Sequence, residues 1–520
     1  MRTRVAVVGA GPVGATVANA LGQLGVETVL LDRETEIIDY PRAAGMDDEC
    51  LRTIQGIDLH EQVLRDVVQN VPLRMFDAAG RCFADIRPST REFGWYRRNI
   101  FLQPQLERVL RAGLARYPHV TFLPGHEVVG LTQDADGVEL TVDGLGTVRA
   151  DHVVAADGGR SPMRELLGIP LVGATHPRKW VVIDALDQRG AVCTGLHCDA
   201  RRPYVSAHLP RGLRRWEFML HPGEDAAPVP DREQVRALLA QHVPDADTVD
   251  VIRARVYTHH SRLASTFVRG RVALAGDAAH LMPPWAGQGL NTGMRDATNL
   301  AWKLALISKG HAGHGLLQTY DDERRAHAAA MIDLSTTLGR ILAPSRPVYG
   351  RLRDVAVRAS GHVPGVKDWV LQMRFKPMPH YRRGVVLEPD RDEAVGRMFP
   401  QPLVEHATGE VVRLDDVLGD GFAVIGHDQD PTAVLDADTV AYLTDLGTRF
   451  VAVGRSRSRP PAVSDRCTAV EDVEGVLTGW FEHRPPIAVV RPDRYLAALT
   501  DPAGLGSAVA RLRTILEGTA

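Results

Sequence analysis

The chain has 520 residues, of which 44% are hydrophobic and 24% charged, and its formal net charge is -3. This length predicts two or three domains that each bury a core, and the balanced charge argues against nucleic acid or a membrane surface as a partner. The five cysteines form no CxxC pair, no signal peptide is visible, and no apolar run approaches the ~20 residues that span a bilayer, so we expect a cytoplasmic protein with reduced thiols and a small-molecule partner.

The N-terminus carries a dinucleotide-binding pattern. An apolar strand over residues 5–8 leads into Gly9, Gly11 and Gly14 in GxGxxG spacing, then a helix of small residues and a second strand that ends at Asp32. The first glycine permits a tight turn, the second lets the backbone approach a pyrophosphate, and the third lets helix and strand pack closely. A carboxylate at Asp32 can accept hydrogen bonds from a ribose hydroxyl. The pattern predicts a bound dinucleotide and leaves NAD and FAD both open.

Two later segments also join a strand to a helix through a glycine-containing turn. The first, "HVVAADGGRSPMRELLG" (152–168), has its turn at Asp157. The second, "RVALAGDAAHLMPPWAGQGLN" (271–291), begins as an apolar strand that runs into Gly276 and Asp277. Its second half holds too many glycines and prolines for one helix or strand, and a buried helix is predicted to follow it.

The three motifs, in this order, resemble those of the FAD-dependent aromatic hydroxylases, the single-component flavoprotein monooxygenases related to para-hydroxybenzoate hydroxylase. The second motif reads DGxxSxxR from Asp157 to Arg164, and the third reads GDAAHxxPPxxGQGxN. Segments such as "DYPRAAGMDDECLRTIQ", "EFGWYRRNIFLQPQLE" and "RVYTHHSRLA" resemble the 3-(3-hydroxyphenyl)propionate hydroxylase branch, and the resemblance extends over nearly the whole chain. It implies a monooxygenase that uses FAD, NADH or NADPH and O2 to hydroxylate a phenolic acid through a C4a-hydroperoxyflavin.

The resemblance assigns FAD contacts by position. Asp277 is expected to reach the ribityl and pyrophosphate region, and the turn after it to lie along the isoalloxazine edge. The next helix would point its N-terminus at the flavin pyrimidine ring, because a helix dipole favours the negative charge of reduced flavin. Arg42 and Gln103 match residues near the FAD phosphates and the ribityl chain, and each also fits an ordinary exposed polar residue. The predicted contacts are Gly9, Gly11, Gly14, Asp32, Arg42, Gln103, Asp157, Gly276, Asp277, Pro284, Gly287, Gly289, Leu290 and Asn291.

Ring hydroxylation is helped by a group that accepts the phenolic proton. Asp47, in "GMDDECLRT", matches the position where related phenol hydroxylases place an acidic residue beside the substrate hydroxyl, and it is the predicted base. Asp48 and Glu49 follow directly, so the run equally fits an acidic cluster at the start of a helix, where the dipole favours negative charge.

The middle of the chain predicts an antiparallel sheet over the flavin. "RPYVSAHLP" and "LRRWEFMLHP" flank an "RGL" turn and alternate in polarity, which indicates a hairpin. If the polar phase faces the substrate, Tyr204 and His208 bind its hydroxyl or carboxylate; if the other phase does, both face away. The resembled branch usually has a small apolar residue at the position of His208, which leaves the substrate open.

No metal site is predicted, because the paired histidines match neither HExxH nor a Cys/His zinc pattern. No second GxGxxG follows a strand, so the nicotinamide donor is expected to bind transiently across the FAD surface. The sequence does not separate NADH from NADPH.

The predicted fold class is α/β, with a Rossmann-like FAD-binding domain, an inserted antiparallel β-sheet substrate domain and a C-terminal thioredoxin-like domain. The C-terminal domain lacks the cysteine pair of thioredoxin and is expected to be structural, with a contact in a homodimer. The boundaries are 1–72, 98–172 and 265–340 for FAD binding, 73–97 and 173–264 for the substrate sheet, 341–395 for a helical connector and 396–520 for the C-terminal domain.

Two alternatives stay open at this point. The same chemistry could act on another phenolic compound, including a polycyclic natural-product intermediate. From a different class, the chain could be an FAD protein without oxygen chemistry, and phenol-dependent O2 consumption separates that class from a hydroxylase.

Overall fold

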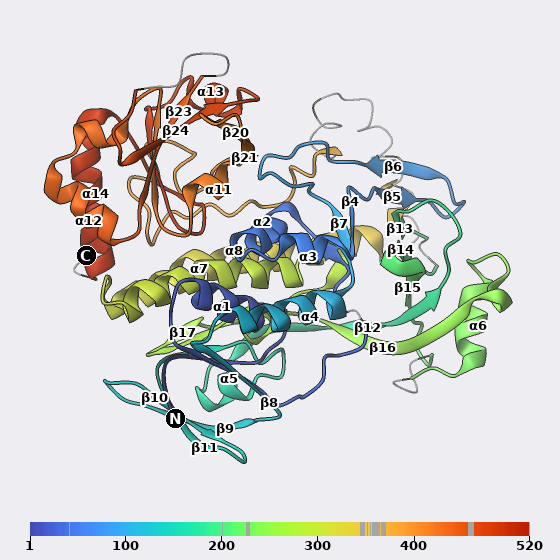
Figure 1. Ribbon diagram of the computed structural model, residues 1–520. Helices are drawn as coiled ribbons and strands as arrows, with labels where there is room; N and C mark the ends of the chain where they lie inside the picture. The colour runs from blue at the N-terminus through green and yellow to red at the C-terminus, as the bar shows by residue number, and fades with distance from the viewer. Residues whose placement is uncertain are drawn as a thin grey trace.

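The computed structural model describes residues 1–518 apart from Pro41, Ala200 and residues 225–228, 344–348, 351, 354, 356–364, 366–370 and 456–461. The described residues form four β-sheets, with helices packed between and around them (Figure 1). Within these ranges, no helix combines the length and the apolar character needed to cross a membrane.

The first sheet is mostly parallel and has β1 (Arg2–Val8) near its centre. β1 is buried from Val5 to Val8, as expected for a parallel strand covered on both faces. The parallel strands of this sheet are, in order, β8 (Val120–Pro124), β2 (Thr28–Asp32), β1, β11 (Gly146–Ala155) and β18 (Val272–Leu274). Antiparallel additions are β17 (Val268–Arg269) on β18, β10 (Val138–Val142) on β11 and β9 (Val128–Gln133) on β10.

Helices in the middle of the molecule cover this sheet (Figure 1). α1 (Pro12–Gln23) packs against α7 (Gly289–Ser308). Most of α7 is buried, including polar residues such as Arg295, Asp296 and Lys303, which form buried ion pairs. The other helices of this region are α2 (Asp48–Gly56), α3 (His60–Leu64), α4 (Gln103–Gly113), α5 (Pro162–Leu166) and α8 (Gln318–Leu342).

The second sheet is antiparallel apart from one parallel pair, β13 with β5. It contains the predicted hairpin, whose strands β14 and β15 are joined by a turn at residues 210–212. α6 (Arg232–Ala240) packs on one face of the sheet against Trp216 and Phe218. The strand order is β19 (His280–Leu281), β16 (Asp250–Ala264), β12 (Leu171–Leu186), β15 (Leu213–Met219), β14 (Tyr204–His208), β13 (Thr194–His197), β5 (Leu73–Phe76) and β6 (Cys82–Ile86).

A small third sheet joins the first two regions. Its central strand, β7 (Asn99–Phe101), pairs with β3 (Gly45–Met46) on one side and β4 (Val67–Gln69) on the other. Ile100 of β7 packs with Ala207 and Leu209 at the end of the hairpin. The loop before α2 is thereby held against the second sheet.

The C-terminal region has its own sheet, drawn in orange and red in Figure 1, on the other side of the central helices from α6. Its order is β21 (Val411–Arg413), β20 (Leu403–His406), β24 (Cys467–Asp472), β23 (Arg449–Gly454), β22 (Ala423–His427), β25 (Ile487–Val490) and β26 (Leu496–Thr500). Strands β22 to β24 are parallel, and β25 and β26 are antiparallel to their neighbours. Its helices are α11 (Leu414–Leu418), α12 (Ala437–Asp445), α13 (Val476–Phe481) and α14 (Leu505–Glu517).

Much of the connector predicted as helical over residues 341–395 lies outside the described residues. Residues 372–395, which are described, form turns and irregular structure around the prolines of "RFKPMPHY".

Candidate active site

The glycines of the first motif differ in what surrounds them. Gly9 has φ +101°, and a Cβ there would lie 2.4 Å from the carbonyl oxygen of Ala156. A Cβ on Gly14 would lie 1.9 Å from the carbonyl oxygen of Gly9, whereas a Cβ on Gly11 would meet nothing within 4 Å. Packing therefore requires glycine at two of the three positions, and Gly11 leaves open space at the N-terminus of α1, an end of a helix that favours phosphate groups.

Asp32 lies at the end of β2, beside this turn. Its Oδ2 accepts the N–H of Ala10 at 2.6 Å and its Oδ1 accepts the N–H of Glu34 at 2.9 Å. Each carboxylate oxygen can accept a second hydrogen bond, so the position remains suited to a ribose hydroxyl.

The second motif braces the third. Asp157 accepts hydrogen bonds from the Ser161 hydroxyl at 2.5 Å and from the N–H of Met163 at 3.0 Å, which positions the first turn of α5. Arg164 then donates from Nη1 to the carbonyl oxygen of Ala278 at 3.2 Å. In this way α5 holds the segment that carries Gly276 and Asp277.

A buried carboxylate supports the same segment from α7. Asp296 accepts hydrogen bonds from the Gly276 N–H at 3.1 Å, from His280 Nε2 at 2.7 Å and from Arg324 Nε at 2.9 Å. The side chain of Asp277 is exposed between buried neighbours, so it is free to contact a ligand. His280 acts in this structure as a support of the loop.

The proline-rich turn leads into α7 through Pro284 and Gly287, which has φ +62°. α7 begins at Gly289 and Leu290 with no side-chain cap on its first N–H groups, and those groups favour an anion at this end. Asn291 is buried and ties the helix start to β3, since its Nδ2 donates to the carbonyl oxygen of Gly45 at 3.2 Å.

Arg42 and Gln103 lie next to one another, but they differ in exposure. Arg42 is exposed. Gln103 is buried, and its Oε1 accepts the N–H groups of Arg42 at 3.1 Å and Ala43 at 2.7 Å. Gln103 therefore shapes the loop that presents Arg42.

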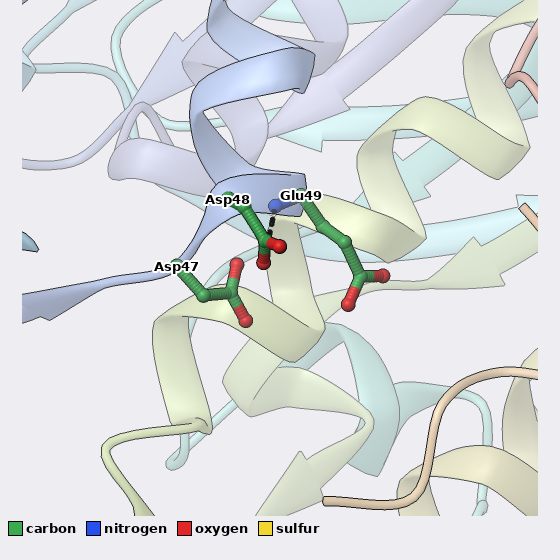
Figure 2. A group of neighbouring side chains, drawn as sticks. All are labelled: Asp47, Asp48 and Glu49. Atoms are coloured by element: carbon green, nitrogen blue, oxygen red, sulfur yellow. Dashed lines mark hydrogen bonds between the residues drawn. The ribbon is translucent and has the colours of Figure 1, made fainter. Parts of the chain in front are cut away.

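Figure 2 shows the acidic run at the start of α2, where Asp47, Asp48 and Glu49 lie together. Asp47 is the N-cap, since its Oδ1 accepts the N–H of Cys50 at 2.9 Å. Its Oδ2 accepts hydrogen bonds from Arg295 and from Lys376 Nζ, the latter at 2.8 Å. Burial raises the pKa of Asp47, but the two cations outweigh burial and leave it below the usual value.

The other two carboxylates have opposite surroundings. Glu49 accepts hydrogen bonds from Arg295 Nε at 2.6 Å and Lys376 Nζ at 2.8 Å. Among the described residues, Asp48 accepts a hydrogen bond only from the N–H of Glu49, at 3.2 Å, the dashed line in Figure 2, and its Oδ2 lies 3.6 Å from Arg97 Nε. Burial raises the pKa of Asp48 to about 6. The three carboxylates are close enough to hold a cation, but Arg295 and Lys376 already neutralise two of them, so we assign no metal here.

The hairpin strand β14 turns its polar phase away from the FAD-binding region. Tyr204 packs under α6 and stacks on His197 with ring centroids 3.9 Å apart. His208 is hydrogen-bonded through Nε2 to the carbonyl oxygen of Arg189 at 3.0 Å. The apolar phase, Ala207 and Leu209, packs on β7 instead. The structure therefore brings neither Tyr204 nor His208 to the loops that carry the FAD motifs.

Sequence reasoning missed several residues on the face of the second sheet toward those loops. Tyr257 donates a hydrogen bond to Glu217 Oε2 at 2.6 Å, and burial raises the pKa of both groups. Trp285 of the proline-rich turn packs on Trp180, with ring centroids 4.4 Å apart. The alternation of "LRRWEFM" could have identified this face, because Glu217 points to the opposite side of the strand from Trp216 and Phe218. No local sequence pattern identifies Arg295 and Lys376 as the partners of Asp47.

These residues fit FAD. The backbone at Gly11 is open, Asp277 is exposed on a braced loop, and the first turn of α7 is uncapped. Each of these features suits a different part of a flavin dinucleotide: pyrophosphate, ribityl chain and pyrimidine ring.

Comparisons with known proteins agree with an FAD site. Residues 2–335 match the family model described as FAD binding domain, and residues 396–515 match the HcaD C-terminal domain. The chain is 54% identical to the 3-(3-hydroxy-phenyl)propionate/3-hydroxycinnamic acid hydroxylase 2 of Burkholderia vietnamiensis, over 98% of this chain and 96% of the relative. It is 47% identical to a 3-(3-hydroxy-phenyl)propionate/3-hydroxycinnamic acid hydroxylase of Klebsiella pneumoniae, over 99% and 95%.

Solved structures place the fold in the same group. The flavin-dependent monooxygenase PieE, solved with FAD and substrate, has a TM-score of 0.82 over 99% of both chains at 23% identity, which shows the fold. The p-nitrophenol 4-monooxygenase PnpA of Pseudomonas putida is 27% identical with a TM-score of 0.68, over 74% of this chain and 99% of that one. The predicted resemblance and the mixed α/β fold are confirmed, and the chain belongs to the family of FAD-dependent aromatic hydroxylases, which are flavoprotein monooxygenases.

Proposed function

We propose that this protein hydroxylates the aromatic ring of a 3-hydroxyphenyl three-carbon acid, such as 3-(3-hydroxyphenyl)propionate, with NADH or NADPH and O2 as co-substrates. The observation that carries the proposal is the 45–54% identity, over almost the full length of both chains, to relatives named for this acid and for 3-hydroxycinnamic acid. The polycyclic alternative has weaker support, since the anhydrotetracycline hydroxylase OxyS of Streptomyces rimosus is 26% identical with a TM-score of 0.74.

FAD, when bound, supplies electron transfer and oxygen activation. The protein provides a rigid loop and an uncapped helix start to bind the flavin ring system. The loop after Gly276 is held by Asp296 and Arg164, so it needs little rearrangement on binding. The uncapped N–H groups at the start of α7 stabilise negative charge in front of them.

Asp47 stays our prediction for the group beside the ring hydroxyl. Because Arg295 and Lys376 keep its carboxylate ionised, it would act as a fixed hydrogen-bond acceptor that draws the hydroxyl proton and enriches the ring in electron density. Its cap to Cys50 gives it a structural role as well. Asp47→Asn keeps the cap, whereas Asp47→Ala removes it, so a catalytic role requires that both variants lose hydroxylation.

The function is tested with the purified flavoprotein. NADH and NADPH oxidation, O2 uptake and product are followed with and without 3-(3-hydroxyphenyl)propionate. We expect the acid to accelerate nicotinamide oxidation and to yield a catechol in step with O2 uptake. If other phenols stimulate turnover and this acid does not, the proposed substrate is wrong. If no phenol is hydroxylated although flavin is bound and reduced, the proposed reaction is refuted.

For the C-terminal region we infer a thioredoxin-like arrangement with a structural role, including a contact in a homodimer. The inference is supported by the β22-α12-β23 parallel unit, by the antiparallel β25 and β26 beside β22, and by α14 after them. Cys467 is the one cysteine after residue 395, so a dithiol is not available in this region. Light scattering of the purified protein tests the homodimer.

A further inference from the structure

Arg98 is a partly buried arginine whose guanidinium group forms no ion pair with a carboxylate of the described residues. It directly precedes β7. Its Nε donates to the carbonyl oxygen of Val71 at 3.2 Å and its Nη2 to Thr194 Oγ1 at 3.3 Å. In the described part of the chain no Asp or Glu forms an ion pair with it, and Nη1 donates to no described residue. Its neighbour Arg97, by contrast, pairs with Glu92 at 2.9 Å.

A cation that loses most of its hydration and gains no counter-ion is costly. Proteins normally pair buried charges, because the loss of hydration is not otherwise compensated. Burial lowers the pKa of Arg98 to about 10, which reflects this cost. The side chain nevertheless keeps part of its surface accessible. An incoming anion can therefore reach the guanidinium and relieve the cost.

The position of Arg98 relates it to the candidate active site. Its partner Thr194 is in register with Ala207, whose side chain is on the face of the second sheet that packs on β7. Asn99 pairs with Met46 between β7 and β3, so Arg98 and Asp47 each lie one residue beyond the same pair. Backbones at such a point are about 5 Å apart. The two side chains bind different partners, since Asp47 accepts from Lys376 and Arg98 donates to the carbonyl oxygen of Val71.

We propose that Arg98 determines substrate specificity by binding the side-chain carboxylate of the phenolic acid. This assignment rests on the proposed function. The substrate carries a hydroxyl at one end and a carboxylate at the other, and the site offers an acceptor, Asp47, just after β3 and a cation, Arg98, just before β7. The free Nη1 and the fork geometry of guanidinium suit a carboxylate, which can accept two parallel hydrogen bonds.

Other arginines on this face are less suitable. Arg215 already makes two hydrogen bonds to Asp184, at 2.8 and 3.0 Å. Arg253 stacks over the ring of Tyr40. Arg255 is exposed, so an anion gains less there than at the partly buried Arg98. Arg255 is therefore the matched control.

The test compares an acid with a neutral phenol. Wild type, Arg98→Gln, Arg98→Lys and Arg255→Gln are assayed with 3-(3-hydroxyphenyl)propionate and with 3-ethylphenol, which has no carboxylate. In Arg98→Gln we expect kcat/KM to fall about 100-fold for the acid, mainly through KM, and less than about 3-fold for the phenol. Arg98→Lys should recover part of the loss, and Arg255→Gln should keep the preference of wild type.

A second measurement separates this inference from the proposed reaction. The affinity of the oxidised holoenzyme for 3-phenylpropionate, which lacks the ring hydroxyl, is measured from the change in flavin absorbance. We expect Arg98→Gln to weaken it about 100-fold. Equal affinity in both proteins, equal loss of acid and phenol turnover, or a selective loss in Arg255→Gln would each overturn the role of Arg98. Failure of wild type to hydroxylate the acid would instead refute the proposed function, and the binding comparison would still decide Arg98. Flavin content and circular dichroism check that each variant is folded.

Discussion

Two glycines of the first motif should respond to the same substitution in opposite ways. At Gly14 an alanine Cβ would lie 1.9 Å from the carbonyl oxygen of Gly9, a backbone atom that cannot move aside by changing rotamer. Reaching ordinary contact requires α1 and β1 to separate by roughly 1.5 Å, which disrupts the packing of α1 on α7. At Gly11 the same Cβ meets no protein atom within 4 Å, and its φ of -68° suits alanine.

The expected magnitudes follow from these contacts. Gly14→Ala should lower the free energy of unfolding of the apoprotein by about 3 kcal/mol or more, the upper range for overpacking. The entropy of unfolding scales with chain length, so for 520 residues that loss corresponds to a Tm lower by about 3 °C or more. Gly11→Ala should change the apoprotein by less than about 0.5 kcal/mol. Its Cβ fills the space into which we place the pyrophosphate, so FAD affinity should fall at least about 10-fold.

Urea unfolding of the two apoproteins and FAD titration followed by flavin fluorescence measure both effects. The reasoning is refuted if Gly11→Ala destabilises the apoprotein as much as Gly14→Ala does, or if Gly11→Ala binds FAD with the affinity of wild type.

Two further predictions concern α2. The pKa of Asp48 is about 6 in the folded protein and about 3.8 unfolded, so the folded state holds more protons between these values and stability falls as pH rises from about 4 to 6. Asp48→Asn should remove this loss, so that its free energy of unfolding exceeds that of wild type by up to about 3 kcal/mol at pH 7 and shows no advantage below about pH 4. Urea unfolding at several pH values measures the difference, and a difference that does not change with pH would contradict the prediction. Arg52 makes two buried hydrogen bonds of 2.7 Å to Asp415 of the C-terminal region. Arg52→Ala should therefore lower the free energy of unfolding by about 3 kcal/mol or more, which is detected as a lower Tm. Arg52→Met with Asp415→Leu should recover part of that cost, and an unchanged Tm in Arg52→Ala would show that the pair does not hold α2 to this region.

Some of the fold was predictable because its determinants are local. The turn after β1 is specified within a few residues, since Gly9 needs positive φ and Gly14 needs close contact with that same turn. The start of α7 at Gly289 and the β14–β15 hairpin are also local, because glycine, proline and alternating polarity determine them.

The orientation of β14 was not predictable in this way. Alternation divides its residues into two phases, but it does not say which phase faces the FAD-binding region. The orientation is determined by packing on both faces of the strand. α6, which follows later in the chain, covers the face of Tyr204, and β7 packs on Ala207.

The amino-acid sequence by itself determined the cofactor motifs, their order and the family, because each motif is a short run whose backbone geometry depends on its own residues. Only the tertiary structure decided which charges meet. Asp47 is paired with Arg295 and Lys376, which lie hundreds of residues along the chain, and Arg98 has no carboxylate partner in the part of the chain that the structure describes. Electrostatic pairing depends on distance in space and on burial, and neither can be read from spacing along the chain.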